Sequence, residues 1–404
     1  MEMEPGKFLR TCGLIALGIF AVTALFNYAM DPYLIFGIPR TAGLNARKPA
    51  VESQQFLIKA YDVLRAYPTT VILGSSSVGQ GIDPESSAWP PELRPVYNLG
   101  IANTTPIESY RYLQHVTARA HVRVVVLGLE FRDLLAPSDT EKQDYESRLV
   151  VKRDGSRNTS LVHQYLHDVV HSTMSLDASV DSFYTLSGNL SGDSSDIIQG
   201  GWDYRPYRFA TSGLGSFPLM VLNDFSYSYT YPQAKVDLTS LTDVRNILNL
   251  CQRRGIRVIL ILDPTHADEL EILDRAGKWP AIEEWKRKLT TLAAQYSRSG
   301  EPVELWDFNG YDDYSTEPVY RRRTALHWFL NPAHYTHPLG DIMLRQIFSG
   351  TDTAFGARLT PKTVEARLRQ VRDQQLHYRE LQQSDIDRVS KIYELAARTH
   401  STSG

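Results

Sequence analysis

The sequence has few cysteines, no excess of cationic residues and few long apolar runs, and each shortage excludes a class of protein. Its 404 residues include two cysteines. Cys12 lies in an apolar stretch and Cys251 on a predicted helix, so we expect neither a disulfide nor a zinc site. Lys and Arg number 43 against 46 Asp and Glu, which gives no reason to expect nucleic acid as a partner. We expect no metal and no cofactor.

One long apolar run is nevertheless present, near the N-terminus. Residues 11–30 carry almost no charge, Lys7 and Arg10 precede them, and Asp31 follows. About 20 apolar residues cross a bilayer core, and cations ahead of such a run favour a cytoplasmic N-terminus. We therefore expect residues 1–30 to form a cytoplasmic tip and a transmembrane anchor. A cleaved signal peptide and a buried core helix are the alternatives.

Short apolar runs then alternate with helical patterns, after a connector over residues 31–66. The candidate strands are Thr70 to Leu73, Val96 to Leu99, Val122 to Leu129, Arg257 to Leu262 and Val303 to Trp306. Helical spacing of apolar residues follows Thr242 and Ile282. Strands that alternate with helices predict an α/β fold with a parallel sheet covered on both faces. Function in such sheets collects at the carboxyl ends of the strands.

The alternation breaks over residues 131–238, which we interpret as an insertion at the active-site end of the sheet. Its second half is densely aromatic. These rings form either a small satellite core or a groove for sugar rings, whose C–H faces pack on aromatic side chains. In the second case Trp202, Tyr204 and Tyr207 are the candidate substrate-binding residues.

The C-terminal residues 357–404 predict a separate, charged helical hairpin. Thr360 and Pro361 suit the start of its first helix, and Ser384 with Asp387 suits the start of the second. We expect the hairpin to pack on the main domain, with a partner-binding surface as the alternative.

The first segment that could take part in catalysis is the serine loop that follows the first strand. Gly74, Ser75, Ser76 and Ser77 stand where the chain turns from the strand into a helix. A serine there is exposed and close to backbone N–H groups, which are the conditions for a nucleophile with an oxyanion hole. Serines also cap helices and fill turns routinely.

Three later segments also fall at strand ends. They contain the run from Asn98 to Asn103, Glu130 after the strongest strand, and a late loop with His334 and His337. A lone histidine more often caps or packs than acts as a base. Two histidines in one loop, at a strand-to-helix connection that a parallel sheet brings near the serine loop, favour a base.

Together these four segments resemble the SGNH (GDSL-like) hydrolase superfamily. More narrowly, DPYLIFG, GSSSVGQGIDP, NLGIANTTPIESY and the late HY…P..GD pattern are similar to membrane-anchored SGNH-like proteins of bacterial envelopes. That group includes proteins for alginate and other exopolysaccharide O-acetylation and for teichoic acid D-alanylation. The resemblance implies a three-layer, flavodoxin-like domain over residues 67–350. It also implies a bacterial inner-membrane anchor, a periplasmic or otherwise extracytoplasmic domain, and acyl-ester chemistry on a surface polymer.

The resemblance also assigns roles to particular residues. Ser76 matches the nucleophile, His334 matches the base, and Gly100 matches the glycine that joins Ser76 in the oxyanion hole. Asn103, Glu130, His266 and His337 are candidates for supporting positions around them.

The sequence departs from the pattern at two positions. Glu130 or its neighbour replaces an Asn that would donate to the oxyanion, and Asn331 stands at the acid position three residues before His334. An amide in place of that carboxylate can lower the rate by about 10⁴. Asp307 is the candidate for a relocated acid, with Asp312, Asp313 and Asp263 as further carboxylates at the same end of the sheet.

Three functional hypotheses follow. The first is a Ser76-dependent esterase or O-acyltransferase that acts on an envelope or extracellular polysaccharide. The second is a catalytically degenerate scaffold that binds a glycan or a polytopic membrane acyltransferase. The third is a lipid or thioester hydrolase.

Overall fold

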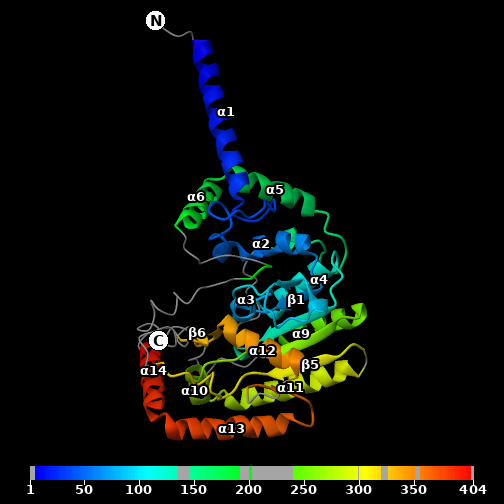
Figure 1. Cartoon of the computed structure of the whole chain (residues 1–404), viewed down its shortest axis with the longest axis vertical. Helices are drawn as coiled ribbons and strands as arrows, with labels where there is room; N and C mark the ends of the chain where they lie inside the picture. The colour runs from blue at the N-terminus through cyan, green and yellow to red at the C-terminus, as the bar shows by residue number, and fades with distance from the viewer. Residues whose placement is uncertain are drawn as a thin grey trace. The chain divides into compact units, whose positions relative to one another are not determined.

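The structure of the protein is a computed structural model, drawn in Figure 1. It describes residues 5–134, 145–191, 200–202, 240–298, 300–319, 326–350 and 355–401. The chain divides into two compact units. The first joins Met1–Arg65 with Gln143–Ile198, and the second joins Ala66–Lys142 with Gln199–Gly404.

The first unit is helical. Its elements are α1 (Pro5–Met30), α2 (Val51–Ala66), the 3-10 turn η3 (Glu146–Arg148), α5 (Leu161–Met174) and α6 (Leu176–Leu190). Within the described chain, α1 is the one helix long and apolar enough to cross a membrane, from Gly6 to Met30. The predicted apolar span is therefore present as a continuous helix.

A small apolar core holds this unit together. It is formed by Tyr33, Leu34, Ile35, Ala50, Ile58, Tyr61 and Ala178. The connector and residues 143–198 thus fold as one body. This differs from our interpretation of residues 131–238 as an insertion in the sheet domain, because α5 and α6 pack with the N-terminal segment instead.

The second unit is built on a six-stranded sheet with the order β2-β1-β3-β4-β5-β8. The first five strands are parallel, and β8 pairs antiparallel with β5. Their bounds are β1 Thr70–Leu73, β2 Val96–Asn98, β3 Val124–Leu129, β4 Arg257–Leu262, β5 Val303–Asp307 and β8 Ala357–Arg358. The predicted α/β fold with a mostly parallel sheet is confirmed.

The central strands are buried along almost their whole length, as their apolar, β-branched sequences predict. All residues of β1 and β3 are buried, and so are five of the six in β4. Since alternate side chains of a strand point to opposite faces, the sheet is covered on both sides. The covering and flanking helices are α3 Ser76–Gly81, α4 Pro106–Thr117, α9 Ser240–Arg254, α10 Ala267–Arg275, α11 Trp279–Ser297 and α12 His337–Ser349. Two 3-10 turns, η1 (Pro91–Leu93) and η2 (Phe131–Leu134), and a small hairpin of β6 (Phe329–Asn331) and β7 (His334–Tyr335) complete this part.

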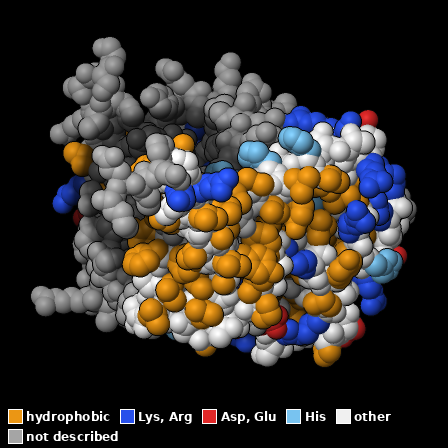
Figure 2. All heavy atoms as spheres, turned by 90° about the horizontal axis from the view of Figure 1, so that it is seen from above, with side chains coloured by type: hydrophobic (Ala, Val, Ile, Leu, Met, Phe, Trp, Pro, Cys, Tyr) orange, Lys and Arg blue, Asp and Glu red, His pale blue; other side chains and the backbone are white. Residues whose placement is uncertain are grey.

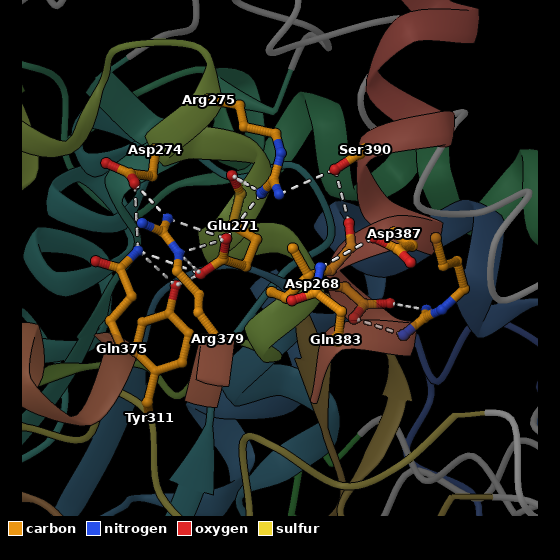
Figure 3. A network of polar contacts seen from close by, with 12 residues as sticks. Asp268, Glu271, Asp274, Arg275, Tyr311, Gln375, Arg379, Gln383, Asp387 and Ser390 are labelled. Atoms are coloured by element: carbon orange, nitrogen blue, oxygen red, sulfur yellow. Dashed lines mark hydrogen bonds and ion pairs between the residues drawn. The ribbon is translucent and has the colours of Figure 1, made fainter. Parts of the chain in front are cut away.

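The C-terminal tail forms α13 (Val364–Leu381) and α14 (Gln383–Ser401), and ion pairs fasten both helices to α10. Figure 3 shows the buried Glu271 carboxylate at the centre, where it accepts from Arg379 at 3.0 Å and from the Tyr311 hydroxyl at 2.9 Å. Arg388 of α14 pairs with the buried Asp268. These ion pairs between buried carboxylates of α10 and arginines of the tail make the tail part of the second unit.

Candidate active site

The serine loop follows β1 directly. Gly74 has a φ of +136°, and a Cβ at this position would lie 2.9 Å from the carbonyl oxygen of Gly128. Ser75 caps α3 by accepting from the Ser77 N–H at 3.2 Å. Ser76 is therefore the first residue of α3 and is half-buried. N–H groups of the first helical turn have no acceptor within the helix, so the Ser76 N–H suits an oxyanion.

The β6–β7 hairpin brings the late histidine to this serine. Nε2 of His334 lies 2.6 Å from Oγ of Ser76, across 258 positions of the chain. A second link runs beside it, from the Ser77 hydroxyl to the carbonyl oxygen of Ala333 at 2.9 Å. The hydroxyl and imidazole that the sequence predicted as a pair are within hydrogen-bonding distance.

Asn331 occupies the third position of this chain of contacts. Its Oδ1 lies 2.8 Å from Nδ1 of His334 and also accepts from the backbone N–H groups of Ala333 and His334, at 3.0 and 2.9 Å. Backbone N–H groups only donate, so the side-chain atom that they face is the oxygen and not the NH₂ group. An oxygen there requires a proton on Nδ1, which leaves Nε2 as the acceptor toward Ser76.

Two glycines allow the serine and histidine segments to approach this closely. A Cβ on Gly81 would lie 2.1 Å from the Tyr335 ring, and a Cβ on Gly340 would lie 1.9 Å from the carbonyl oxygen of Gly81. Both distances are far below van der Waals contact. The glycines of VGQG and PLGD thus permit the contact between α3, β7 and α12 that places His334.

Glu130, which stands in place of the expected Asn, adds a negatively charged side chain to the site. Its side chain is 10% exposed, accepts from the Ser75 hydroxyl and pairs with Arg132. Burial alone would raise the pKa of this carboxyl. Arg132, the Ser75 hydroxyl and the nearby His334 outweigh burial and hold the pKa of Glu130 below its usual value. The carboxylate therefore stays ionised and stabilises a positive charge on His334.

Two more acids lie behind Glu130. Burial, and then the Glu130 charge, hold the pKa of Asp263 well above its usual value. The same two causes raise the pKa of Asp133 to about 7. Asp263 accepts from the Tyr335 hydroxyl at 3.1 Å, so a carboxyl with a raised pKa holds the residue that follows His334.

Gly100 has a different role from the one that the resemblance implies. The Gly100 N–H donates to Oδ1 of Asn98 at 2.8 Å, so it is not directed to an oxyanion. A Cβ on Gly100 would lie 2.6 Å from the Gly79 nitrogen, so this glycine is needed for close packing against α3. Asn103 is exposed and has a φ of +58°.

Asp307 is not the relocated acid, and this expectation was wrong. The buried Asp307 carboxylate pairs with Lys286 at 2.9 Å and with Arg367 at 3.3 Å, while Asn331 occupies Nδ1 of His334. Asp312 is also engaged, since its Oδ1 accepts from backbone N–H groups of its own turn. Burial raises the pKa of Asp312 to about 6.

The remaining predicted residues divide into three groups. His266 is structural, because its Nδ1 caps α10 and its Nε2 lies 2.9 Å from the carbonyl oxygen of Glu317. Trp202 packs edge-on against His337, with 5.4 Å between ring centroids, and donates to the carbonyl oxygen of Gln80 in α3 at 3.0 Å. The Trp202 ring therefore lies beside α3, the helix that begins with Ser76. Tyr204 and Tyr207 fall outside the described residues.

A small cavity of about 20 Å³ opens beside Glu130. It is lined by Glu130, Arg132, Thr265, Glu269, Asn309 and Ala333 together with apolar side chains. That volume accommodates about one water-sized group. Among the residues that the structure describes, no group of three or more His, Cys, Asp or Glu side chains is arranged to hold a metal ion.

Comparisons of the chain with known protein families, with curated proteins and with solved structures gave no match. The functional argument therefore rests on the geometry of the site.

Proposed function

We propose that the protein is a serine esterase or O-acyltransferase of SGNH type, acting on an acylated polysaccharide of the cell envelope. One observation carries the proposal: Ser76 Oγ, His334 Nε2 and Nδ1, and Asn331 Oδ1 form one hydrogen-bonded chain. This is the arrangement in which a histidine removes the proton of a serine nucleophile.

The proposed reaction begins when Ser76 Oγ attacks the carbonyl carbon of an acyl ester. Its proton passes to Nε2 of His334, and the carbonyl electrons move to the oxygen, which the Ser76 N–H stabilises. Collapse of this intermediate breaks the ester bond, and His334 returns the proton to the leaving oxygen. A sugar hydroxyl or water then loses its proton to His334 and attacks the carbonyl carbon of the acyl-serine. The bond from that carbon to Ser76 Oγ breaks, and His334 returns the proton to Oγ.

Two neighbours compensate for the missing acid. Asn331 orients the imidazole but adds no charge, because it is an amide. The Glu130 carboxylate supplies negative charge near His334 from another direction. An ionised group that stabilises the imidazolium lowers the barrier to proton removal from Ser76, which is the electrostatic part of the role of the acid.

The fold and the apolar helix support the remaining parts of the proposal. The parallel strands have the order 2-1-3-4-5, which is that of flavodoxin-like sheets. Ser76 and Glu130 follow β1 and β3, at the switch point where such sheets bind ligands. The length of α1 and the cations Lys7 and Arg10 in its first turns favour an inner-membrane anchor with the second unit on the periplasmic side.

Hydrolysis of p-nitrophenyl acetate by the full-length protein in detergent tests the activity. Ser76→Ala is expected to lower kcat/KM by at least about 10³. Thr291→Ala is the control, since it removes a hydroxyl from the exposed side of α11 without touching the site. Equal activity in the wild type and Ser76→Ala would refute the proposal.

A second function is favoured by the state of the oxyanion hole. The Gly100 N–H is bonded to Asn98, and a carboxylate replaces the expected Asn donor. Both features suit a scaffold that binds a glycan or a polytopic acyltransferase without catalysis. In producing cells, an unchanged O-acyl content of the surface polysaccharide in Ser76→Ala would support this function. Deletion of the tail is unsuitable as a test because it would remove Arg379 and Arg388, which pair with the buried Glu271 and Asp268.

A further inference from the structure

The surface that α5 and α6 expose is rich in large apolar side chains and also carries His163, His167, His171 and Asp177, whereas most of the side chains that they bury are polar. Ten large apolar side chains of these helices are each at least 39% exposed: Val162, Tyr165, Leu166, Val170, Met174, Leu176, Val180, Phe183, Tyr184 and Leu190. The residues that they bury are Asp168, Ser172, Ala178, Ser182, Thr185 and Asn189. An amphipathic helix facing water has the reverse arrangement.

Hydrogen bonds fix this orientation. Asp168 of α5 accepts from the Tyr61 hydroxyl and from Arg148, both at 2.7 Å. Asp181 of α6 accepts from the Tyr33 hydroxyl at 2.7 Å. Rolling either helix to hide its apolar side would break these bonds and leave charged groups unpaired, so the apolar side stays exposed.

The exposed apolar surface of α5 and α6 begins at the C-terminal end of α1, where α1 contacts these two helices. The buried Asn27, near the end of α1, donates to the Thr173 carbonyl oxygen at 2.9 Å and to the Ser179 hydroxyl at 3.1 Å. Those two residues stand at the junction of α5 and α6, whereas no residue in the 18-residue apolar window of α1 is buried. Figure 2 shows apolar side chains gathered over this end of the molecule.

We propose that α5 and α6 lie in the membrane interface, with their apolar side in the lipid beside α1. The proposal rests on the transmembrane role proposed for α1, which brings the bilayer surface to Asn27. Apolar helix faces are buried about 5–10 Å into the headgroup and acyl boundary when helices lie on a membrane. Tyr165 and Tyr184 are of the type that gathers at this depth, and Phe183 suits the apolar face of an interfacial helix.

Lipid is the occupant that the observations favour over protein. The apolar side of α5 and α6 continues the exposed apolar surface of α1, and a bilayer that surrounds one must reach the other. Soluble monomers rarely expose apolar patches larger than a few hundred Å². With α1 across the bilayer and α5 and α6 at its surface, the orientation of the first unit on the membrane would also be fixed.

Fluorescence quenching on the full-length protein tests this placement. In a Cys12→Ser background, Leu166→Cys and Phe183→Cys carry an environment-sensitive fluorophore, and the buried Cys251 stays unlabelled. The protein is reconstituted into phosphatidylcholine–phosphatidylglycerol vesicles that contain doxyl-labelled lipid. We expect doxyl lipid to quench both labels and aqueous iodide to leave them bright.

Two reference labels separate the outcomes. Leu17→Cys reports on α1, and Asp154→Cys, in a charged exposed turn, reports quenching in water. Lipid quenching at Leu17 with iodide quenching at Leu166 and Phe183 would overturn the interface proposal and leave the anchor standing. Protection of both sites from iodide and from doxyl lipid would also overturn it, because a protein surface would then cover them. Absence of lipid quenching at Leu17 would instead refute the transmembrane role of α1.

Discussion

Asn331 presents its side-chain oxygen to Nδ1 of His334 at 2.8 Å, and two backbone N–H groups hold that oxygen in place. The amide thus fixes the tautomer that a serine hydrolase needs, although it cannot supply the charge of an acid. Because Asn and Asp differ only in one side-chain group, a substitution at Asn331 can test the effect of charge at this position without changing the size of the side chain.

Asn331→Asp keeps the size of the side chain and its three acceptor contacts while it adds a negative charge. A carboxylate that faces Nδ1 stabilises the imidazolium, so we expect kcat/KM for an acetyl ester to rise by about tenfold or more. Asn331→Leu, which removes the acceptor, should lower it. Initial rates against substrate concentration measure both. A fall in kcat/KM for Asn331→Asp would show that the third position does not act through His334.

Glu130→Gln removes the charge next to His334 but leaves an acceptor for Ser75. Without the carboxylate the imidazolium is less stable, so kcat/KM should fall by about tenfold and the acid limb of its pH profile should move to lower pH. A merely structural role for Glu130 would change the rate without moving that limb. The measurement is kcat/KM from pH 4 to pH 9, with Thr291→Ala as the control.

Gly81→Ala tests the packing that brings the two segments together. The new Cβ would meet the Tyr335 ring at 2.1 Å, and overpacking of this kind lowers the free energy of unfolding by about 1–3 kcal/mol. Displacement of Tyr335 also moves His334 from Ser76, so activity should fall further than stability explains. Gly188→Ala is the matched control, because its Cβ would lie 3.8 Å from Pro49. Normal activity in Gly81→Ala would contradict this explanation.

Asp263→Asn tests the buried acid below Tyr335. Burial holds the pKa of Asp263 well above its usual value, so the folded state binds this proton more tightly than the unfolded chain. That stabilisation is fully present below the pKa of the unfolded carboxyl, about 3.9, and is lost as the pH rises through the raised pKa. Asn cannot ionise and still accepts from Tyr335. Thermal unfolding should therefore show the variant to be more stable than the wild type at pH 9, with a smaller difference at pH 5.

The sequence predicted the sheet well because buried parallel strands have a strong local pattern. Residues 70–73 and 257–262 were expected as strands and form β1 and β4 with those bounds. The sequence also indicated that Ser76 and His334 lie close together, since the carboxyl ends of parallel strands lie at the same edge of a sheet. It could not reveal that Arg367, 60 positions later, binds Asp307, because such pairing depends on where the tail packs.

The sequence did not predict α5 and α6, which lie within the segment interpreted as an insertion. The side chains that these helices bury are mostly polar, so the helices lack the apolar spacing that marks a core-facing helix. Similarly, the sequence marked Glu130 as a departure from the SGNH pattern, but its contacts with Ser75 and Arg132 come only from the folded loop.

The most direct test of the central claim is to map the adduct of a fluorophosphonate probe on the intact protein by peptide mass spectrometry. The proposed mechanism predicts one modified residue, Ser76, and loss of that adduct in Ser76→Ala and in His334→Ala. Modification that persists in Ser76→Ala, or a wild-type protein that the probe leaves unmodified, would contradict it.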